Sequence, residues 1–220
     1  MAEATDSVGR AFDLVAEEYA QRFFHELDAK PFDRKRLAAF ADRCPRAAPV
    51  LEIGCGPGHV GRFVAARGPR VVGLDLSVDS ARVAHRMNPH LAFVAGDMRA
   101  LPLRGGAAGA LLAFYSLIYF DPPTTAAILG EFRRVMRPGA PLFLAVHAGD
   151  GAERFTTFAD KAIDITLHYH QPASLADAVA RAGFTVDAVE TRAPYPSEHP
   201  TTRLYVRATA LPLPTGERAG

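Results

Sequence analysis

The chain has 220 residues, 49% of them hydrophobic, and a formal net charge of +1. This length suits one domain with a full core, and the balanced charge gives no general reason to expect nucleic acid or an anionic membrane as partner. Two cysteines, Cys44 and Cys55, supply neither a disulfide framework nor a metal site. The longest uncharged run, residues 105–120, is shorter than the roughly 18 residues of a membrane span. With a polar, acidic N-terminus unlike a signal peptide, these features predict a cytoplasmic protein.

The first part of the chain predicts two helices. Apolar side chains such as Phe12 and Tyr19 recur at helical spacing over residues 8–27. A second helix is expected over residues 31–41, where Asp33 could cap the start. The simplest role of both helices is to pack against the core.

Strands and helices then alternate. The predicted strands cover residues 50–53, 70–74, 91–94, 110–114 and 142–146, and the predicted helices cover residues 59–67, 77–87 and 121–136. This alternation predicts right-handed crossovers and a parallel sheet covered on both faces. Ligands of such sheets bind beyond the carboxyl ends of the strands.

The later part of the chain is less regular. Residues 148–171 carry aromatic side chains and two histidines without a clear period. Residues 184–190 and 203–209 are two further predicted strands, and residues 211–220 are predicted to be a disordered tail. We find no repeat and no second-domain boundary, so residues 1–210 are expected to form one domain.

A glycine-rich turn follows the first strand. Glu52, Gly54, Gly56 and Gly58 form the pattern E-x-G-x-G-x-G. Glycine is needed where the backbone takes a positive φ or lies directly against a ligand, and the following helix N-terminus attracts polar groups. Residues 56–61 also match the dinucleotide pattern G-x-G-x-x-G, which keeps NAD open as a ligand.

Two acidic residues distinguish these possibilities. Asp75 ends the second strand, and Gly96-Asp97-Met98 follows the third. A later turn contains Arg137-Pro138-Gly139. Together, and in this order along the chain, these motifs resemble those of the class I S-adenosyl-L-methionine (SAM) dependent methyltransferases, of the methyltransferase-11/25 type. The resemblance covers about residues 49–146.

The resemblance implies an α/β fold. A Rossmann-like, doubly wound seven-stranded sheet is expected, mostly parallel with an antiparallel last strand and helices on both faces. Residues 1–45 would form a helical lid over the cofactor, and Phe12 and Tyr19 are the lid residues expected to contact it. The connection over residues 191–202, which contains His199, would lie on the active-site side.

The resemblance also implies SAM as cofactor and S-adenosyl-L-homocysteine as product. Asp75 would hold the ribose hydroxyls, Leu76 and Met98 would enclose the adenine, and Asp97 would accept from its amino group. The glycines would admit the methionine tail, and Glu52 would orient the amides of the turn. The expected cofactor residues are Tyr19, Glu52, Gly54, Cys55, Gly56, Gly58, Asp75, Leu76, Asp97, Met98 and Phe114.

The expected reaction transfers a methyl group to O, N or C of a small-molecule metabolite. Candidate catalytic residues are His147, His168, His170 and Tyr115, since histidine suits a general base near neutral pH. His168 and His170 would share one face of an extended segment, but no further ligand indicates a metal. The alternatives are a SAM-binding protein without methyl transfer and an NAD-dependent oxidoreductase. We expect no nucleic-acid or membrane partner, and a monomer or homodimer.

Overall fold

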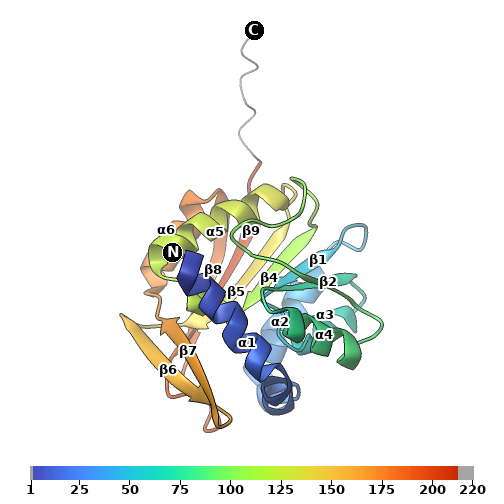
Figure 1. The fold of residues 1–220 in the computed structure, drawn as a ribbon. Coiled ribbons are helices and arrows are strands. Elements are labelled where there is room, and N and C mark those ends of the chain that lie inside the picture. The colour runs from blue at the N-terminus through green and yellow to red at the C-terminus, as the bar shows by residue number, and fades with distance from the viewer. Residues whose placement is uncertain (1, 213–220) are drawn as a thin grey trace.

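The computed structural model describes residues 2–212, with side chains from residue 7 onward. Residues 213–220, most of the predicted tail, lie outside the described residues. Seven strands form one sheet in the order β3-β2-β1-β4-β5-β9-β8 (Figure 1). The strands are β1 (Val50–Ile53), β2 (Val71–Asp75), β3 (Ala92–Ala95), β4 (Ala110–Phe114), β5 (Pro141–His147), β8 (Phe184–Arg192) and β9 (Arg203–Ala210).

The pairing of the strands confirms the predicted sheet. β1 pairs in parallel with β2 on one side and with β4 on the other, so the strand order reverses beside β1. β5 pairs with β4 in parallel and with β9 in antiparallel orientation. The fold is therefore Rossmann-like, and its switch point lies above the glycine turn.

Helices cover both faces of the sheet. They are α1 (Ala2–Phe23), α2 (Pro31–Arg43), α3 (His59–Ala65), α4 (Val78–Met87), α5 (Pro122–Val135) and α6 (Pro172–Arg181). Two short 3-10 helices, η1 (Glu26–Ala29) and η2 (Leu117–Tyr119), lie between them. Side chains of the central strand β4 alternate between two cores. Leu111 belongs to the core under α5 and α6, whereas Leu112 belongs to the core under α2 and α3. No helix within residues 2–212 has the length and apolar character that a membrane crossing requires.

The start of α2 differs from the prediction. Lys30 is the N-cap residue and makes no side-chain cap. Asp33 lies in the first turn, fully buried, and its carboxylate binds Arg192 and Tyr205 instead. The expectation that Asp33 caps the helix is wrong, because a distant cation and a phenol compete successfully for the carboxylate.

A β-hairpin, β6 (Ala152–Phe158) and β7 (Lys161–His168), occupies the region that showed no clear period. Its two turn residues, Ala159 and Asp160, have φ angles of 47° and 62°. Two consecutive positive φ angles are typical of a type I′ turn, which usually contains glycine or asparagine. The sequence lacked that signal. The hairpin lies beside α1 (Figure 1). Lys161 joins the two elements, because its Nζ lies 2.7 Å from Glu18 Oε1.

Candidate functional site

A cavity of about 950 Å³ lies at the carboxyl edge of the parallel strands. Its lining comes from α1, the glycine turn, the ends of β2, β4 and β5, the hairpin and the β8–β9 loop. The predicted site residues that line it are Tyr19, Glu52, Gly54, Cys55, Gly56, Asp75, Leu76, Asp97, Met98, Phe114, Tyr115 and His147. Phe12 of α1 also lines it. Gly58, His168 and His170 are not in this lining.

The glycines of the turn serve different purposes. Gly54 has a φ of 66°, and a Cβ atom there would lie 2.3 Å from the Cβ of Ser116. Gly56, with a φ of 49°, faces the cavity opposite Tyr19. Gly58 is the left-handed N-cap of α3, and a Cβ atom there would lie 2.7 Å from the ring of Phe93. Packing, rather than contact with the cavity, therefore requires glycine at position 58.

Asp75 is held rigidly at the end of β2. Its Oδ2 accepts from the amide of Gly56 at 2.8 Å, and its Oδ1 accepts from the amide of Ser77 at 2.9 Å. Burial raises the pKa of this carboxyl, although both amides oppose the shift. A carboxylate has about four acceptor sites, so each oxygen keeps capacity for a hydroxyl donor. Asp75 thus braces the glycine turn and faces the cavity at once.

Asp97 and Met98 lie beside the same cavity. Both oxygens of Asp97 receive hydrogen bonds from the Arg99 guanidinium, at 2.6 to 3.1 Å. Although burial opposes it, this pairing lowers the pKa of the Asp97 carboxyl. Asp97 is therefore ionised, and any ligand amino group shares its oxygens with Arg99.

The comparisons with known proteins agree with this geometry. Residues 50–139 match the family model described as "Methyltransferase domain". A malonyl-[acyl-carrier protein] O-methyltransferase of Pseudescherichia vulneris is 34% identical over 163 residues, which are 74% of this chain and 61% of that protein. These matches place residues 50–139 in the class I SAM-dependent methyltransferase family.

Two further comparisons extend over more of the chain. An N-demethylindolmycin N-methyltransferase of Streptomyces griseus is 28% identical over 80% of this chain and 86% of its own length. The solved DhpI–SAH complex has the same fold, with a TM-score of 0.74 and 20% identity over 97% of this chain and 100% of the other. The chain spans about three fifths of the first two curated relatives.

Glu52 of this methyltransferase domain is buried beneath the turn. It is 2% exposed, and burial raises its pKa to about 8. Within the described residues its Oε2 has no hydrogen-bond partner. A Cβ atom on Gly61 would lie 2.3 Å from that oxygen, so the side chain fits tightly under α3. Glu52 is therefore mainly protonated at neutral pH.

Replacing this carboxyl should change how stability depends on pH. The folded state keeps the Glu52 proton between its ordinary pKa of 4.5 and the raised value of about 8, whereas the unfolded chain releases it. The free energy of unfolding therefore falls as pH rises through this window, by at most about 1.4 kcal/mol per pH unit. We expect Glu52→Gln to lose this decline, so its stability relative to wild type rises from pH 5 to pH 8. Urea unfolding at several pH values measures this, and parallel curves would contradict it.

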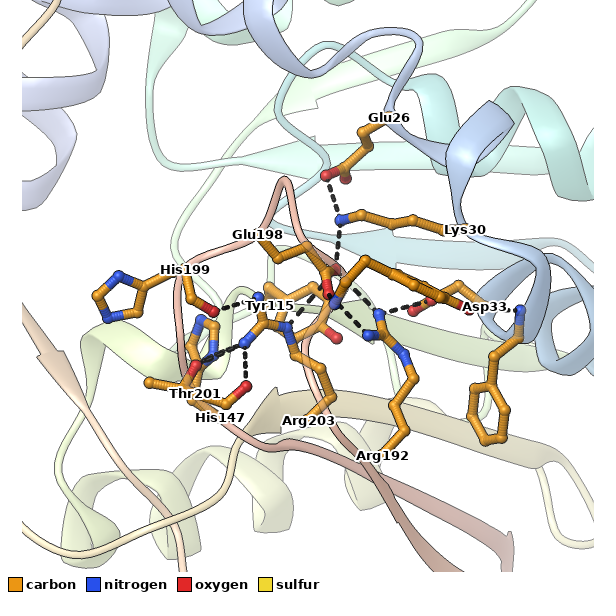
Figure 2. A network of polar contacts seen from close by, with 12 residues as sticks. Glu26, Lys30, Asp33, Tyr115, His147, Arg192, Glu198, His199, Thr201 and Arg203 are labelled. Carbon is orange, nitrogen blue, oxygen red and sulfur yellow. Dashed lines mark hydrogen bonds and ion pairs between the residues drawn. The ribbon is translucent and has the colours of Figure 1, made fainter.

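A buried polar network adjoins the cavity (Figure 2). Glu198, 3% exposed at its side chain, binds Arg192 at 2.7 Å and Lys30 at 3.0 Å. Although burial alone would raise it, the hydrogen bonds from Arg192 hold the pKa of Glu198 well below its usual range. Arg192 also reaches Asp33, at 2.7 Å. The network joins α2 to the β8–β9 loop.

Tyr115 is connected to this network through a second phenol. The hydroxyl of Tyr205 donates to Asp33 at 2.7 Å, so it accepts from Tyr115, 3.0 Å away. Tyr115 has a positive φ of 55°, a strained conformation for a residue with a Cβ atom, at the turn after β4. The network thus fixes a ring that lines the cavity.

His147 is held in one protonation state. Its Nδ1 lies 3.1 Å from the Arg203 guanidinium and 2.7 Å from Thr201 Oγ1. A guanidinium can only donate, so Nδ1 accepts and the proton of the neutral ring is on Nε2. Burial first, and Arg203 second, lower its pKa to about 3. His147 is therefore a neutral hydrogen-bond donor, a state that suits positioning better than proton removal.

The structure does not bring His168 and His170 into the cavity. β7 ends at His168, and His170 bridges to Ala148 in a buried position. Burial lowers the pKa of His170 to about 4. His168 and His170 therefore do not share a face toward the cavity, because β7 ends at His168 and the extended segment does not continue to His170. His199, from the β8–β9 loop, lines the cavity.

Proposed function

We propose that this protein transfers a methyl group from SAM to an O, N or C atom of a small molecule. The observation that carries the proposal is a single cavity that joins Asp75 and the glycine turn to Tyr115, His147 and His199. One end thus has cofactor-type residues and the other has acceptor-type residues. The names of the relatives, which include an O-methyltransferase and an N-methyltransferase, support this reaction class.

The residues present suit SAM. The cavity volume lies within the range typical of small-molecule sites, roughly 300–1,000 Å³. Gly56 offers bare backbone to the cavity, and Asp75 keeps acceptor capacity for ribose hydroxyls. Leu76 and Met98 offer apolar surface for adenine. Bound SAM supplies a methyl group already activated on a sulfonium.

The protein's own contribution is alignment and exclusion of water. Tyr19 of α1 packs against Phe12, with ring centroids 5.3 Å apart, and against Phe158 of the hairpin, at 5.9 Å. These rings line the cavity and cover it from two elements distant in sequence. Holding two reactants in a fixed geometry lowers a displacement barrier by several kcal/mol or more.

Two measurements test the proposal. Calorimetric titration of the cofactor-free protein with SAM, S-adenosylhomocysteine and NAD should show micromolar binding of the two adenosyl ligands and none of NAD. SAM labelled with a tritiated methyl group is then incubated with a panel of hydroxyl, amine and carboxylate compounds. Transfer of label to a small molecule supports the proposal. Tight SAM binding without transfer to any compound favours the non-catalytic alternative, and NAD binding alone would overturn the cofactor assignment.

The predicted cytoplasmic location, the absence of a nucleic-acid partner and the choice between monomer and homodimer stay predictions. The same holds for the single domain with its N-terminal lid. Gel filtration with light scattering would determine the oligomeric state.

A further inference from the structure

We propose that Glu153 and His199 form the general base of this site, and that His147 positions the acceptor as a hydrogen-bond donor. This inference rests on the proposed function, which it deepens by naming the chemistry of the acceptor. The two residues of the pair are 46 positions apart, on β6 and in the β8–β9 loop. The fold brings them together at the acceptor end of the cavity.

The contact between them determines which nitrogen of His199 is basic. Nε2 of His199 lies 3.0 Å from Oε2 of Glu153. Tyr169 donates to the same oxygen at 2.5 Å, and this hydrogen bond lowers the pKa of Glu153. An ionised carboxylate can only accept, so Nε2 of His199 donates to it. The lone pair of the neutral ring is therefore on Nδ1.

Nδ1 of His199 is accessible. Within residues 7–212 it has no hydrogen-bond partner, and it is not one of the buried polar atoms that lack a partner. Since His199 lines the cavity, this nitrogen can meet a bound molecule. A carboxylate behind one ring nitrogen with the other nitrogen free is the arrangement that orients histidine bases in enzymes.

His147 has the opposite polarity. Its Nδ1 is occupied by Arg203 and Thr201, so its Nε2–H is the group left for the cavity. The two imidazole rings are 6.1 Å apart and nearly perpendicular. One ring therefore donates and the other accepts. When two neighbouring titratable groups are held in different protonation states, one can act as a hydrogen-bond donor or acid and the other as a base.

Titratable and charged side chains from several strands surround His199. Glu153 approaches from β6, Tyr169 follows β7, His147 ends β5, and Arg203 begins β9 and donates to the backbone carbonyl of His199. Phe155 of the hairpin packs edge-on against the ring at 5.6 Å. Glu153 supplies the negative charge that would offset a protonated His199 ring. The positive charge of Arg203 is paired with Glu198, 3.6 Å away.

The acceptor's O–H or N–H proton moves to His199 Nδ1 while the new bond to the methyl carbon forms and the carbon–sulfur bond breaks. The electron pair of that bond stays on the sulfur, which departs as a neutral thioether, and the imidazolium later releases its proton to water. A carboxylate acceptor is already ionised at neutral pH and needs no base. We therefore infer an acceptor with a hydroxyl or N–H group, and with a nearby oxygen that accepts from His147.

Nuclear magnetic resonance tests the pair without any acceptor. In protein with ¹⁵N-labelled histidine, long-range ¹H–¹⁵N spectra at pH 8 report which nitrogen carries the proton, and H199Q and H147Q assign the two signals. We expect the Nε2–H tautomer at both rings. Glu153→Ala should turn His199 into a tautomer mixture, whereas D164N, which breaks an exposed ion pair on the same hairpin, should leave it unchanged. An Nδ1–H tautomer of His199 in the wild type would overturn the proposal.

Kinetics with an acceptor from the labelling screen tests the step. H199Q should lower kcat by about 100-fold or more, with a smaller change in acceptor KM. E153Q can still accept from Nε2–H and should lower kcat without lowering Tm, whereas D164N should match wild type. H147Q, which keeps a donor, should retain more activity than H147A. An unchanged kcat in H199Q would overturn the base assignment. If SAM binds but nothing is methylated, the proposed function fails. The tautomer measurement then still tests whether Nδ1 of His199 carries the free lone pair.

Discussion

Asp75→Ala should weaken SAM binding by about 100-fold or more. A hydrogen bond to a charged group contributes on the order of 1.5–3 kcal/mol, and two ribose hydroxyls together would lose about 3 kcal/mol, which is more than a factor of 100. The substitution also releases the amide of Gly56, which Asp75 holds at 2.8 Å, so the turn loses its brace. Calorimetric titration with SAM and with S-adenosylhomocysteine measures the loss.

The matched control for this experiment is Asp79→Ala. Asp79 lies four residues further on, in the first turn of α4, and pairs with Arg82 in an exposed position. Its removal should leave SAM affinity unchanged. Thermal unfolding of both variants separates lost binding from lost folding. An affinity of Asp75→Ala within threefold of wild type, in a folded protein, would refute the ribose assignment.

Arg192→Met should destabilise the fold by about 3 kcal/mol or more, because it leaves the buried Asp33 carboxylate without its cation and removes one of the cations that pair with Glu198. Asp33 is fully buried and Glu198 is 3% exposed at its side chain. Urea unfolding at pH 7 measures the change in the free energy of unfolding. Arg192 lowers the folded-state pKa of Glu198, so its stabilisation is present above the ordinary pKa of 4.5 and is lost as pH falls below it. The difference between variant and wild type should therefore narrow at acid pH.

Arg154→Met is the control for this loss. Arg154 forms a comparable pair with Asp164, at 2.7 Å, but both side chains are more than half exposed. Exposed ion pairs contribute little, because water and salt screen them. Arg154→Met should therefore unfold at nearly the wild-type urea concentration. If both variants lost the same stability, burial of the network would not be the cause.

The sequence by itself determined the sheet and the end of the cavity that contains Asp75 and the glycine turn, where we propose that SAM binds. Glycines at positions 54 and 56 mark a turn that only small residues allow, and Asp75 follows directly on an apolar strand. Parallel strands place their carboxyl ends at one edge, so residues that follow different strands must meet there. The helix caps Ser77 and Asp121 were equally predictable, since each acts on an amide three residues away.

Only the tertiary structure decided the other end of the cavity, where we propose that the acceptor binds. Glu153 and His199 are 46 residues apart, and Asp33 and Arg192 are 159 apart, so no local pattern pairs them. The turn of the hairpin that carries Glu153 lacks the glycine that would have revealed it. Which nitrogen of a histidine is basic depends on the partner of the other nitrogen. That partner is chosen by how the loops fold over the sheet, because the free energy of a buried polar contact depends on three-dimensional geometry rather than on spacing along the chain.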